Sequence, residues 1–409
     1  MKLVNTIAWV AVVVLSFLVM SSMTSAMSVE AAKVVGNGSK HIAVAYGNGT
    51  FVEVWYSYDG AYFNATAINS TTGGIVKTKT ISKDVYIHNN HPSINPAIIY
   101  IPGLNGFMVT WVNSTNYSEA MVIDSNLNVI YPEMTVNDST GVSYRGIAVG
   151  FDGKKVLFVW SDSNGYLEGR FMNDTYQGNA FRISTYNSEQ KYPSIAYDSH
   201  SGNYMVVWVN HTSEYNITGK IINANTMQPI SGDIPIATVQ SSSDSFTSPY
   251  VAAGNGEFFV TYVNYNSPYN ITAKIFDSNG SLITNKPISI GTTYKYGKSS
   301  MPVTFNGTDF IVAWSNENES IITTSYNLNG TMVTSKVVYN GTNGGNPVIA
   351  YDSDNKGYFF GWTEYQGSGK PYKLSSTILT NDEFVPEFNF VAPILAVAAV
   401  SLVIVRRKH

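Results

Sequence analysis

The chain has 409 residues, of which 13% are charged and 44% hydrophobic, and its formal net charge is −4. Charged residues are well below the usual level of about 25%, and Asn, Ser, Thr and Tyr supply the polarity instead, which suits an extracellular protein, including one in acidic surroundings. The small net charge argues against a nucleic-acid partner, which would need clustered Lys and Arg. Because the chain has no cysteine, disulfides and thiolate metal sites are excluded.

The N-terminus has the order of a secretory signal. Lys2 precedes an apolar stretch from Ile7 to Met20, and small and polar residues then lead to Ala26. We therefore predict that residues 1–26 are a signal peptide that is cleaved after Ala26. An uncleaved N-terminal anchor is the alternative, and the short apolar core argues against it.

The body of the chain repeats one phrase, an apolar strand that begins near a proline and a second apolar strand that ends in an aromatic residue. Pro96, Pro193 and Pro347 are each followed 15 residues later by a tryptophan (111 − 96, 208 − 193, 362 − 347). Closing aromatic residues mark seven such units: Trp55, Trp111, Trp160, Trp208, Tyr262, Trp314 and Trp362. Successive closing residues are 48 to 56 positions apart, for example 160 − 111 = 49 and 111 − 55 = 56.

Periods near 40 to 50 residues with several strands per unit are typical of β-propellers. The first two strands of each unit are apolar at successive positions, as strands buried on both faces require. A partly polar third strand follows, as in 216–222 and 270–276, and an Asn-Gly turn at Asn279 or Asn329 leads to a fourth.

The repeats resemble the seven-bladed β-propellers of archaeal and bacterial surface proteins. We therefore predict an all-β fold, a seven-bladed β-propeller with four-stranded blades, over residues 27–380. A fold-level resemblance implies no activity. A linear array of small β-sandwiches is the structural alternative, but about 50 residues are too few for a sandwich domain.

The last unit has strands near 347–351, 358–362 and 374–379, and no residues remain for a fourth strand. An open outer edge would leave backbone groups unpaired. We predict that residues 28–35 pair antiparallel with residues 374–380 and thereby close the ring.

We predict no catalytic residue, no metal and no cofactor. The loop from Asp352 to Gly357 alternates aspartates before a glycine but lacks the closing Glu of a calcium loop, which favours an ordinary turn. His88 and His91 lack a third zinc ligand, and 291–299 has five residues between its glycines where a phosphate loop needs four. The chain has neither a Gly-x-Ser-x-Gly elbow nor a recurrent carboxylate pair.

The connection after the second strand carries a tyrosine in six units. In a propeller these connections lie on one face, where an aromatic plate with a polar tip suits carbohydrate or peptide binding. Three of these tyrosines lie 7 residues after their closing aromatic residue (62 − 55, 215 − 208, 269 − 262), and this fixed spacing favours packing. The ligand-binding candidates are Tyr62, Tyr117, Tyr166, Tyr215, Tyr269 and Tyr372.

Asn-x-Ser/Thr sequons recur along the whole body, mostly in turns and at strand starts. We expect a fraction of them to carry glycans. The glycosylation candidates are Asn64, Asn116, Asn216, Asn270, Asn279 and Asn329.

The C-terminus has the pattern of a membrane anchor. Phe388 to Val405 contains no charge over 18 residues (405 − 388 + 1), about 27 Å as a helix, and Arg406 to Lys408 follow. We predict that residues 381–409 form a linker, a transmembrane helix and a basic cytoplasmic tail. Pro386-Glu387-Phe388 before this segment resembles the PEF-type sorting tail of archaeal surface proteins, which implies processing by an archaeosortase. A simple anchor is the alternative.

Two functions fit this organisation. The first is a membrane-anchored, glycosylated cell-surface protein without catalytic activity, used for binding, adhesion or envelope structure. Its partners would be the membrane, surface glycans or other envelope proteins, and a sorting enzyme that acts on the tail. The alternative is an extracellular propeller hydrolase that acts on polysaccharide. Three or more Asp, Glu or Arg side chains converging on the central channel would favour the enzyme.

Overall fold

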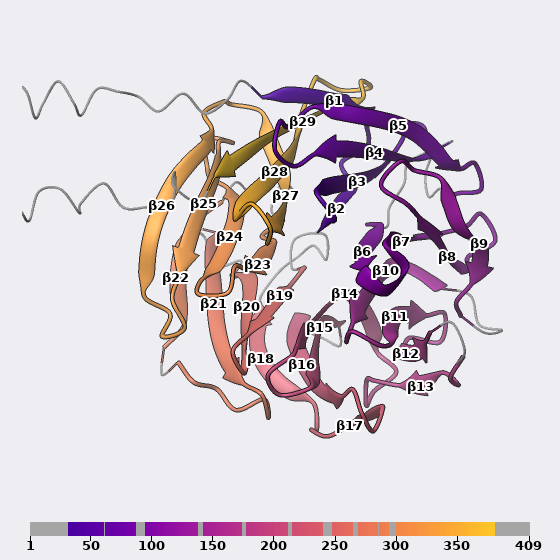
Figure 1. The fold of residues 1–409 in the computed structure, drawn as a ribbon. Helices are drawn as coiled ribbons and strands as arrows, with labels where there is room; N and C mark the ends of the chain where they lie inside the picture. The colour runs from indigo at the N-terminus through magenta and orange to yellow at the C-terminus, as the bar shows by residue number, and fades with distance from the viewer. Residues whose placement is uncertain are drawn as a thin grey trace, which may run out of the picture.

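A computed structural model describes most of the chain between residues 32 and 380. The described ranges are 32–60, 62–86, 95–137, 142–173, 177–211, 215–239, 248–264, 269–284, 286–293 and 300–380. Within these ranges, 29 strands form seven antiparallel sheets arranged as blades around a central axis (Figure 1). The prediction of a seven-bladed β-propeller is therefore confirmed.

In each blade the strands follow one another outward from the axis, and we letter their positions A to D. Blade 1 contains β2 (Ile42–Gly47), β3 (Thr50–Tyr56), β4 (Phe63–Asn69) and β5 (Ile75–Ser82). Blade 2 contains β6 (Ala97–Ile101), β7 (Gly106–Val112), β8 (Ser118–Ile123) and β9 (Val129–Thr135), with the 3₁₀ turn η1 (Pro102–Leu104) between the first two. Blade 3 contains β10 (Val142–Phe151), β11 (Val156–Asp162), β12 (Leu167–Met172) and β13 (Phe181–Arg182).

Blade 4 differs because two short strands share its outer position. It contains β14 (Glu189–Asp198), β15 (Asn203–His211) and β16 (Tyr215–Asn223), and both β17 (Gln228–Pro229) and β18 (Ile234–Val239) pair with β16. Blade 5 contains β19 (Tyr250–Gly254), β20 (Glu257–Asn264), β21 (Asn270–Asp277) and β22 (Ile288–Thr292). Blade 6 contains β23 (Val303–Phe305), β24 (Phe310–Ser315), β25 (Ile321–Tyr326) and β26 (Met332–Tyr339).

Blade 7 is completed by the N-terminal strand. It contains β27 (Gly344–Asp352), β28 (Gly357–Glu364) and β29 (Tyr372–Thr380), and β1 (Lys33–Gly38) pairs antiparallel with β29 from Lys33↔Ser376 to Gly38↔Tyr372. This confirms that an N-terminal strand closes the ring. The observed strand shares residues 33–35 with the predicted segment and extends to Gly38, and residues 28–31 lie outside the described residues.

The extension of the closing strand to Gly38 depends on two glycines of β1. A methyl group at Gly38 would lie 2.6 Å from the Tyr56 carbonyl oxygen and 2.8 Å from the Trp55 ring, and one at Gly36 would lie 3.0 Å from the same ring. Only glycine fits where the closing strand crosses this indole. Lys33 and Val34 pair with Ser376 and Ser375, and the Gly-x-Gly segment extends the same strand past the Trp55 indole as far as Tyr372.

Because the strands alternate in direction, the turns fall on two faces of the disc. We call the face with the A–B and C–D turns the AB/CD face. The opposite face, with the B–C turns and the crossings from D to the next blade, is the BC/DA face. The described chain ends of blade 7 point to the AB/CD face, because Thr380 pairs with Gly357 directly after the A–B turn.

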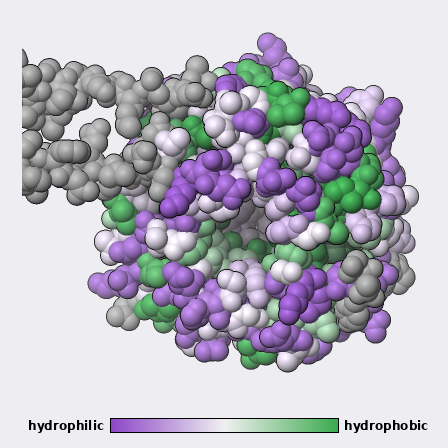
Figure 2. All heavy atoms as spheres, in the orientation of Figure 1, coloured by the Kyte–Doolittle hydropathy of each residue, from purple (hydrophilic) through white to green (hydrophobic). Residues whose placement is uncertain are grey.

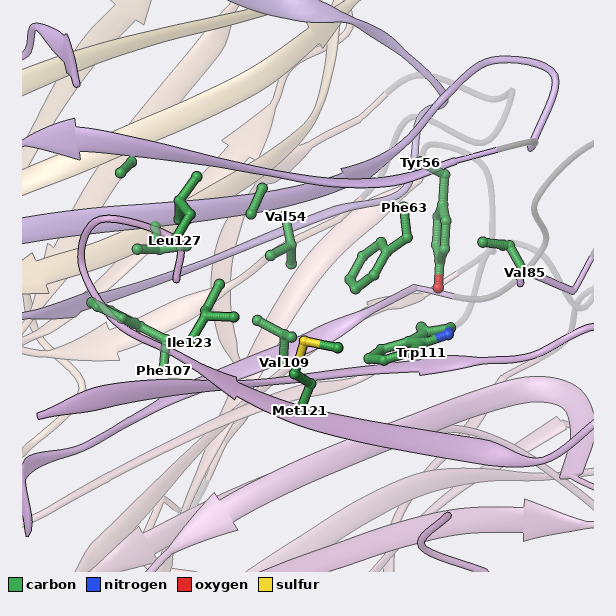
Figure 3. Packing of buried hydrophobic residues seen from close by; sticks show 13 residues of the cluster. Val54, Tyr56, Phe63, Val85, Phe107, Val109, Trp111, Met121, Ile123 and Leu127 are labelled. Carbon is green, nitrogen blue, oxygen red and sulfur yellow. The ribbon is translucent and has the colours of Figure 1, made fainter. Parts of the chain in front are cut away.

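The core consists of seven apolar clusters, one in each interface between neighbouring blades. Figure 3 shows the interface of blades 1 and 2, where Phe63 and Trp111 have ring centroids 5.4 Å apart. All seven closing aromatic residues are at most 8% exposed. Trp208 is fully buried against Leu157 and Val159 of blade 3, and its indole N–H donates to Gln190.

The predicted signal peptide and the predicted C-terminal anchor lie outside the described residues. In the part of the chain that the structure describes, no helix has the length and apolarity needed to cross a bilayer.

Candidate ligand-binding face

The six predicted tyrosines occupy one equivalent position on the BC/DA face. Tyr215 and Tyr372 are the first residues of the C strands β16 and β29. The other four directly precede the C strands β4, β8, β12 and β21: Tyr62, Tyr117, Tyr166 and Tyr269. This shared position explains their recurrent spacing. Since each belongs to a different blade, they are distributed around the ring.

Cationic and aromatic side chains accompany several of these rings. The Arg182 guanidinium lies 3.8 Å from the Tyr166 ring centroid, and Lys83 Nζ lies 5.8 Å from that of Tyr62, both within cation–π range. Tyr372 contacts Tyr365, with ring centroids 5.8 Å apart. Tyr62 is exposed and the other five are partly buried. The rings of Tyr62, Tyr166 and Tyr372 therefore each have a cationic or aromatic neighbour at the protein surface.

The densest polar cluster surrounds Tyr215 in blade 4. The His211 imidazole stacks on the Tyr215 ring with centroids 4.1 Å apart and an angle of 6° between the planes. Glu189 is the cross-strand neighbour of His211, and its Oε2 lies 2.9 Å from His211 Nδ1 and 2.7 Å from Lys191 Nζ. Lys191 Nζ also lies 5.5 Å from the Tyr215 ring centroid.

The side chains of this cluster differ in their exposure to solvent. The Lys191 side chain is 1% exposed, whereas the Glu189 side chain is 49% exposed. A buried ammonium needs a partner, and the carboxylate of Glu189 supplies it. The solvent-facing parts of Glu189, His211 and Tyr215 therefore place hydrogen-bonding groups beside an aromatic surface. The sequence analysis identified Tyr215 but missed the three partners. The β15–β16 pairing places His211 opposite Tyr215, and the β14–β15 pairing adds Glu189 and Lys191.

A second set of tyrosines lies close to the axis on the AB/CD face and was missed from the sequence. Tyr46, Tyr100, Tyr197 and Tyr351 stand at or next to the end of the A strand of their blades. The Tyr46 hydroxyl donates to Asp354 Oδ2 of blade 7 at 2.7 Å. Burial, together with the Asp354 carboxylate, raises the pKa of Tyr100. The sequence signal for Tyr100, Tyr197 and Tyr351 is that each lies four residues after the proline that begins its repeat, at Pro96, Pro193 and Pro347, whereas Tyr46 has no such proline.

Each ring of this second set fills an interface with the preceding blade. A methyl group at Gly47 of blade 1 would lie 2.1 Å from the Tyr100 ring, so the ring packs directly on that backbone. Tyr197 packs in the cluster between blades 3 and 4, and Tyr351 in the cluster between blades 6 and 7. These tyrosines therefore join blades.

Figure 2 shows a hollow at the centre of the disc. Aspartates follow the inner aromatic residue in three blades, and they accept hydrogen bonds from turn amides. Asp152 accepts from Lys154 N, Asp198 from Ser201 N, and Asp352 from Asp354 N, at 2.7 to 2.9 Å. Asp352 thus caps the A–B turn of blade 7 in the same way as Asp152 and Asp198 cap theirs. Among the described residues, no group of three or more His, Asp or Glu could hold a metal.

The remaining sequence candidates fall in different places. His88, His91 and residues 294–299 lie outside the described residues. Asn279 and Asn329 are exposed in C–D turns, and Asn116 is half-buried in a B–C turn. Asn216 and Asn270 are half-buried in β16 and β21. Asn64 is buried in β4, where its Oδ1 accepts a 2.9 Å hydrogen bond from Thr80, which makes it a poor acceptor for a glycan.

No family model matches the chain, and no curated protein matches its sequence. In structure it is similar to the BP39L lectin from Burkholderia pseudomallei, with a TM-score of 0.63 and 11% identity over 84% of this chain and 97% of the lectin. It is also similar to the polysaccharide lyase Uly1, with a TM-score of 0.52 and 10% identity over 85% of this chain and 91% of the lyase.

A third similar structure is the WD40 domain of Toxoplasma gondii coronin, with a TM-score of 0.52 and 10% identity over 88% of this chain and 87% of that domain. At these identities the likeness concerns the fold alone. The chain is a seven-bladed β-propeller.

Proposed function

We propose that the chain is an exported cell-surface protein, held by its C-terminus, whose propeller binds carbohydrate on the BC/DA face without catalysis. The observation that carries this proposal is the cluster of Glu189, Lys191 and His211 around Tyr215. A sugar presents a weakly polar C–H face and a rim of hydroxyls. The aromatic ring can contact the C–H face, and the carboxylate and imidazole beside it can form hydrogen bonds with the hydroxyls.

The repetition of the tyrosine around the ring supports binding at several blades. Tyr62 and Tyr166 each combine an aromatic ring with a cationic neighbour, as Tyr215 does. Several weak sites on a rigid disc would bind a repetitive glycan with an avidity above that of any single site. The propellers of similar fold include the BP39L lectin, which supports the same class of ligand.

Export, anchoring and glycosylation are parts of this proposal that rest on the sequence. Residues 1–26 supply the signal, and the apolar segment from Phe388 to Val405 supplies the tether, either retained as a helix or processed by a sorting enzyme. Of the predicted sequons, the exposed Asn279 and Asn329 are the best placed to carry glycans.

The test is retention of the purified full chain on a panel of immobilised polysaccharides. We expect Tyr215→Ala to weaken binding about tenfold, equivalent to about 1.4 kcal/mol. Tyr131→Ala, which removes an exposed tyrosine from the outer strand β9, is the matched control and should leave binding unchanged. Equal retention of the two variants, or no retention of the parent chain by any polysaccharide, would contradict the proposal.

An enzyme that cleaves polysaccharide is the second candidate, because His211 Nδ1 lies 2.9 Å from the exposed carboxylate of Glu189. An imidazole oriented by a carboxylate is a pairing used in general acid–base catalysis. The same polysaccharide panel distinguishes binding from cleavage. After each polysaccharide is eluted, its chain length is measured. Shortening that His211→Gln abolishes would establish the enzyme.

A further inference from the structure

Exposed aliphatic side chains recur at one structural position in the outer strands of the propeller. In five blades the residues that follow the C–D turn and begin the D position are apolar and 38% to 57% exposed. We call this set the apolar girdle: Ile75 and Val76, Val129 and Ile130, Ile230, Leu282 and Ile283, and Met332 and Val333. Figure 2 shows apolar patches separated by polar residues around the edge of the disc.

The register places the girdle residues at equivalent positions. Val129 pairs with Ile123, and Met332 pairs with Tyr326, the last residue of the preceding C strand in each case. In blade 5, Leu282 pairs with Phe276, the penultimate residue of the C strand β21. The girdle therefore lies along the AB/CD edge of the outer wall. Single exposed aliphatic side chains are common on protein surfaces and need no explanation. Here they recur at the same structural position in five blades, which calls for one.

The opposite edge is different in chemistry. Among the described residues, the exposed large hydrophobic side chains on the turns and crossings of the BC/DA face are the tyrosines Tyr62, Tyr186 and Tyr365, and the one exposed aliphatic residue near this edge of a D strand is Val337 of β26. A tyrosine keeps a polar tip in water, whereas Ile, Val, Leu and Met do not. The two faces of the disc thus suit two different environments.

The chain leaves the disc on the side of the girdle. Thr380 pairs with Gly357 at the AB/CD face, and Lys33 Nζ donates to the Thr72 carbonyl in the C–D turn of blade 1 at 2.6 Å. Seven residues, 381–387, separate Thr380 from the apolar segment that begins at Phe388 (387 − 381 + 1). Even fully extended they span no more than about 25 Å.

We infer that the AB/CD face docks onto the lipid surface and that the girdle enters the headgroup region of the bilayer. This inference rests on the proposed C-terminal anchor, which would keep the face within that short reach and so at high effective concentration. Apolar side chains gain free energy in the interfacial layer. Docking would turn the BC/DA face, with the cluster around Tyr215, away from the cell.

The charges beside the girdle are of both signs, so apolar contact and not attraction to anionic lipid drives docking. Lys77 lies in β5 next to the girdle residue Val76, and it acts electrostatically on Asp124 of the neighbouring C–D turn. Binding should therefore depend little on salt and on the fraction of anionic lipid, unlike that of a polybasic surface.

The absence of cysteine allows a direct test with single-cysteine variants of the full chain. Val76→Cys and Ile283→Cys report on the girdle, and Tyr365→Cys is the matched exposed control on the other face. Each variant is labelled with a fluorophore and reconstituted into phosphatidylcholine vesicles that contain nitroxide-bearing lipid. We expect at least threefold quenching at positions 76 and 283 and little at 365.

The outcomes separate docking from anchoring. If the protein floats with the vesicles but all three labels are quenched equally, or none is, docking is wrong and the anchor stands. If the protein does not float with vesicles, both the anchor and the docking that depends on it are wrong. Shielding of positions 76 and 283 in detergent without vesicles, with a doubled mass, would place a second copy of the chain on the girdle and overturn the lipid assignment.

Discussion

The Tyr46 hydroxyl donates a 2.7 Å hydrogen bond to Asp354 Oδ2 although the two residues are 308 positions apart in the sequence. Tyr46 is the penultimate residue of β2, the inner strand of blade 1, and Asp354 lies in the A–B turn of blade 7. Nearby, Asn355 Nδ2 donates to Ser70 Oγ at 3.2 Å across the same interface. The ring is therefore closed near its axis by side chains and at its outer edge by β1.

The closing strand should be sensitive to a single methyl group. In Gly38→Ala the new carbon would overlap the Tyr56 carbonyl and the Trp55 ring, so we expect a loss of about 1–3 kcal/mol in unfolding free energy, as for overpacked sites. Gly103→Ala is the matched control, because a methyl group there meets nothing within 4 Å. Urea denaturation followed by tryptophan fluorescence measures both. Equal stability of the two variants would show that β1 does not close the ring tightly.

The closing aromatic residues should carry much of the stability. Trp208 is fully buried between blades 3 and 4, and we expect Trp208→Ala to cost about 3–5 kcal/mol, as for other large-to-small core substitutions. Tyr186→Ala, which truncates an exposed ring, should change stability by less than about 0.5 kcal/mol. A cost below about 1 kcal/mol for Trp208→Ala would remove the basis for assigning these residues to the core.

The repeat made the architecture predictable because each unit shows the same pattern, and a buried second strand such as β15 must be apolar on both faces. Pairing of an N-terminal segment with blade 7 could be predicted because its outer position lacked residues. The register could not, since it depends on how Gly36 and Gly38 pass the Trp55 ring.

The candidate sites were less accessible to sequence reasoning. Tyr215 followed from its spacing to Trp208, but its partners Glu189 and Lys191 lie 26 and 24 positions earlier in the chain (215 − 189, 215 − 191). The bulged pairing of β14 with β15 places Glu189 opposite His211, and the pairing of β15 with β16 places His211 opposite Tyr215. The role of the inner tyrosines between blades could not be predicted, because it depends on contacts as distant as that of Tyr46 with Asp354.

The anchor prediction can be tested by truncation. A chain that ends before Pro386 retains all described strands, and we expect it to be released into the medium instead of remaining with the membrane fraction. Mass spectrometry of the mature full-length protein then separates the two forms of anchoring. Loss of Arg406 to Lys408 would indicate processing by a sorting enzyme, whereas their retention would indicate a simple helix. Continued membrane association of the truncated chain would contradict both.

Glu53 makes stability depend on pH. It lies in β3 at the interface of blades 1 and 7, is fully buried, and neither carboxyl oxygen has a hydrogen-bond partner. A methyl group at Gly361 of blade 7 would lie 2.9 Å from its Oε1, so the carboxyl group is packed directly on β28. Burial raises the pKa of Glu53 from 4.5 to about 8. The folded protein therefore keeps this proton at neutral pH, whereas the unfolded chain releases it.

The sign of the effect follows from that shift. Because the pKa is raised on folding, the stability associated with the proton is fully present below about pH 4.5 and is lost as the pH rises through about 8. We expect the unfolding free energy to fall by a few kcal/mol over this window, and Glu53→Gln, which stays neutral, to remove most of the fall. Glu317→Gln, at an exposed carboxylate, should leave this fall unchanged.

Denaturation of the three proteins at pH 5, 6.5 and 8 measures the unfolding free energy across the window. A constant value in the parent chain, or the same fall in Glu53→Gln, would mean that Glu53 does not titrate in this window. A fall that depends on Glu53 would mean that the closure between blades 1 and 7 is strongest in acid.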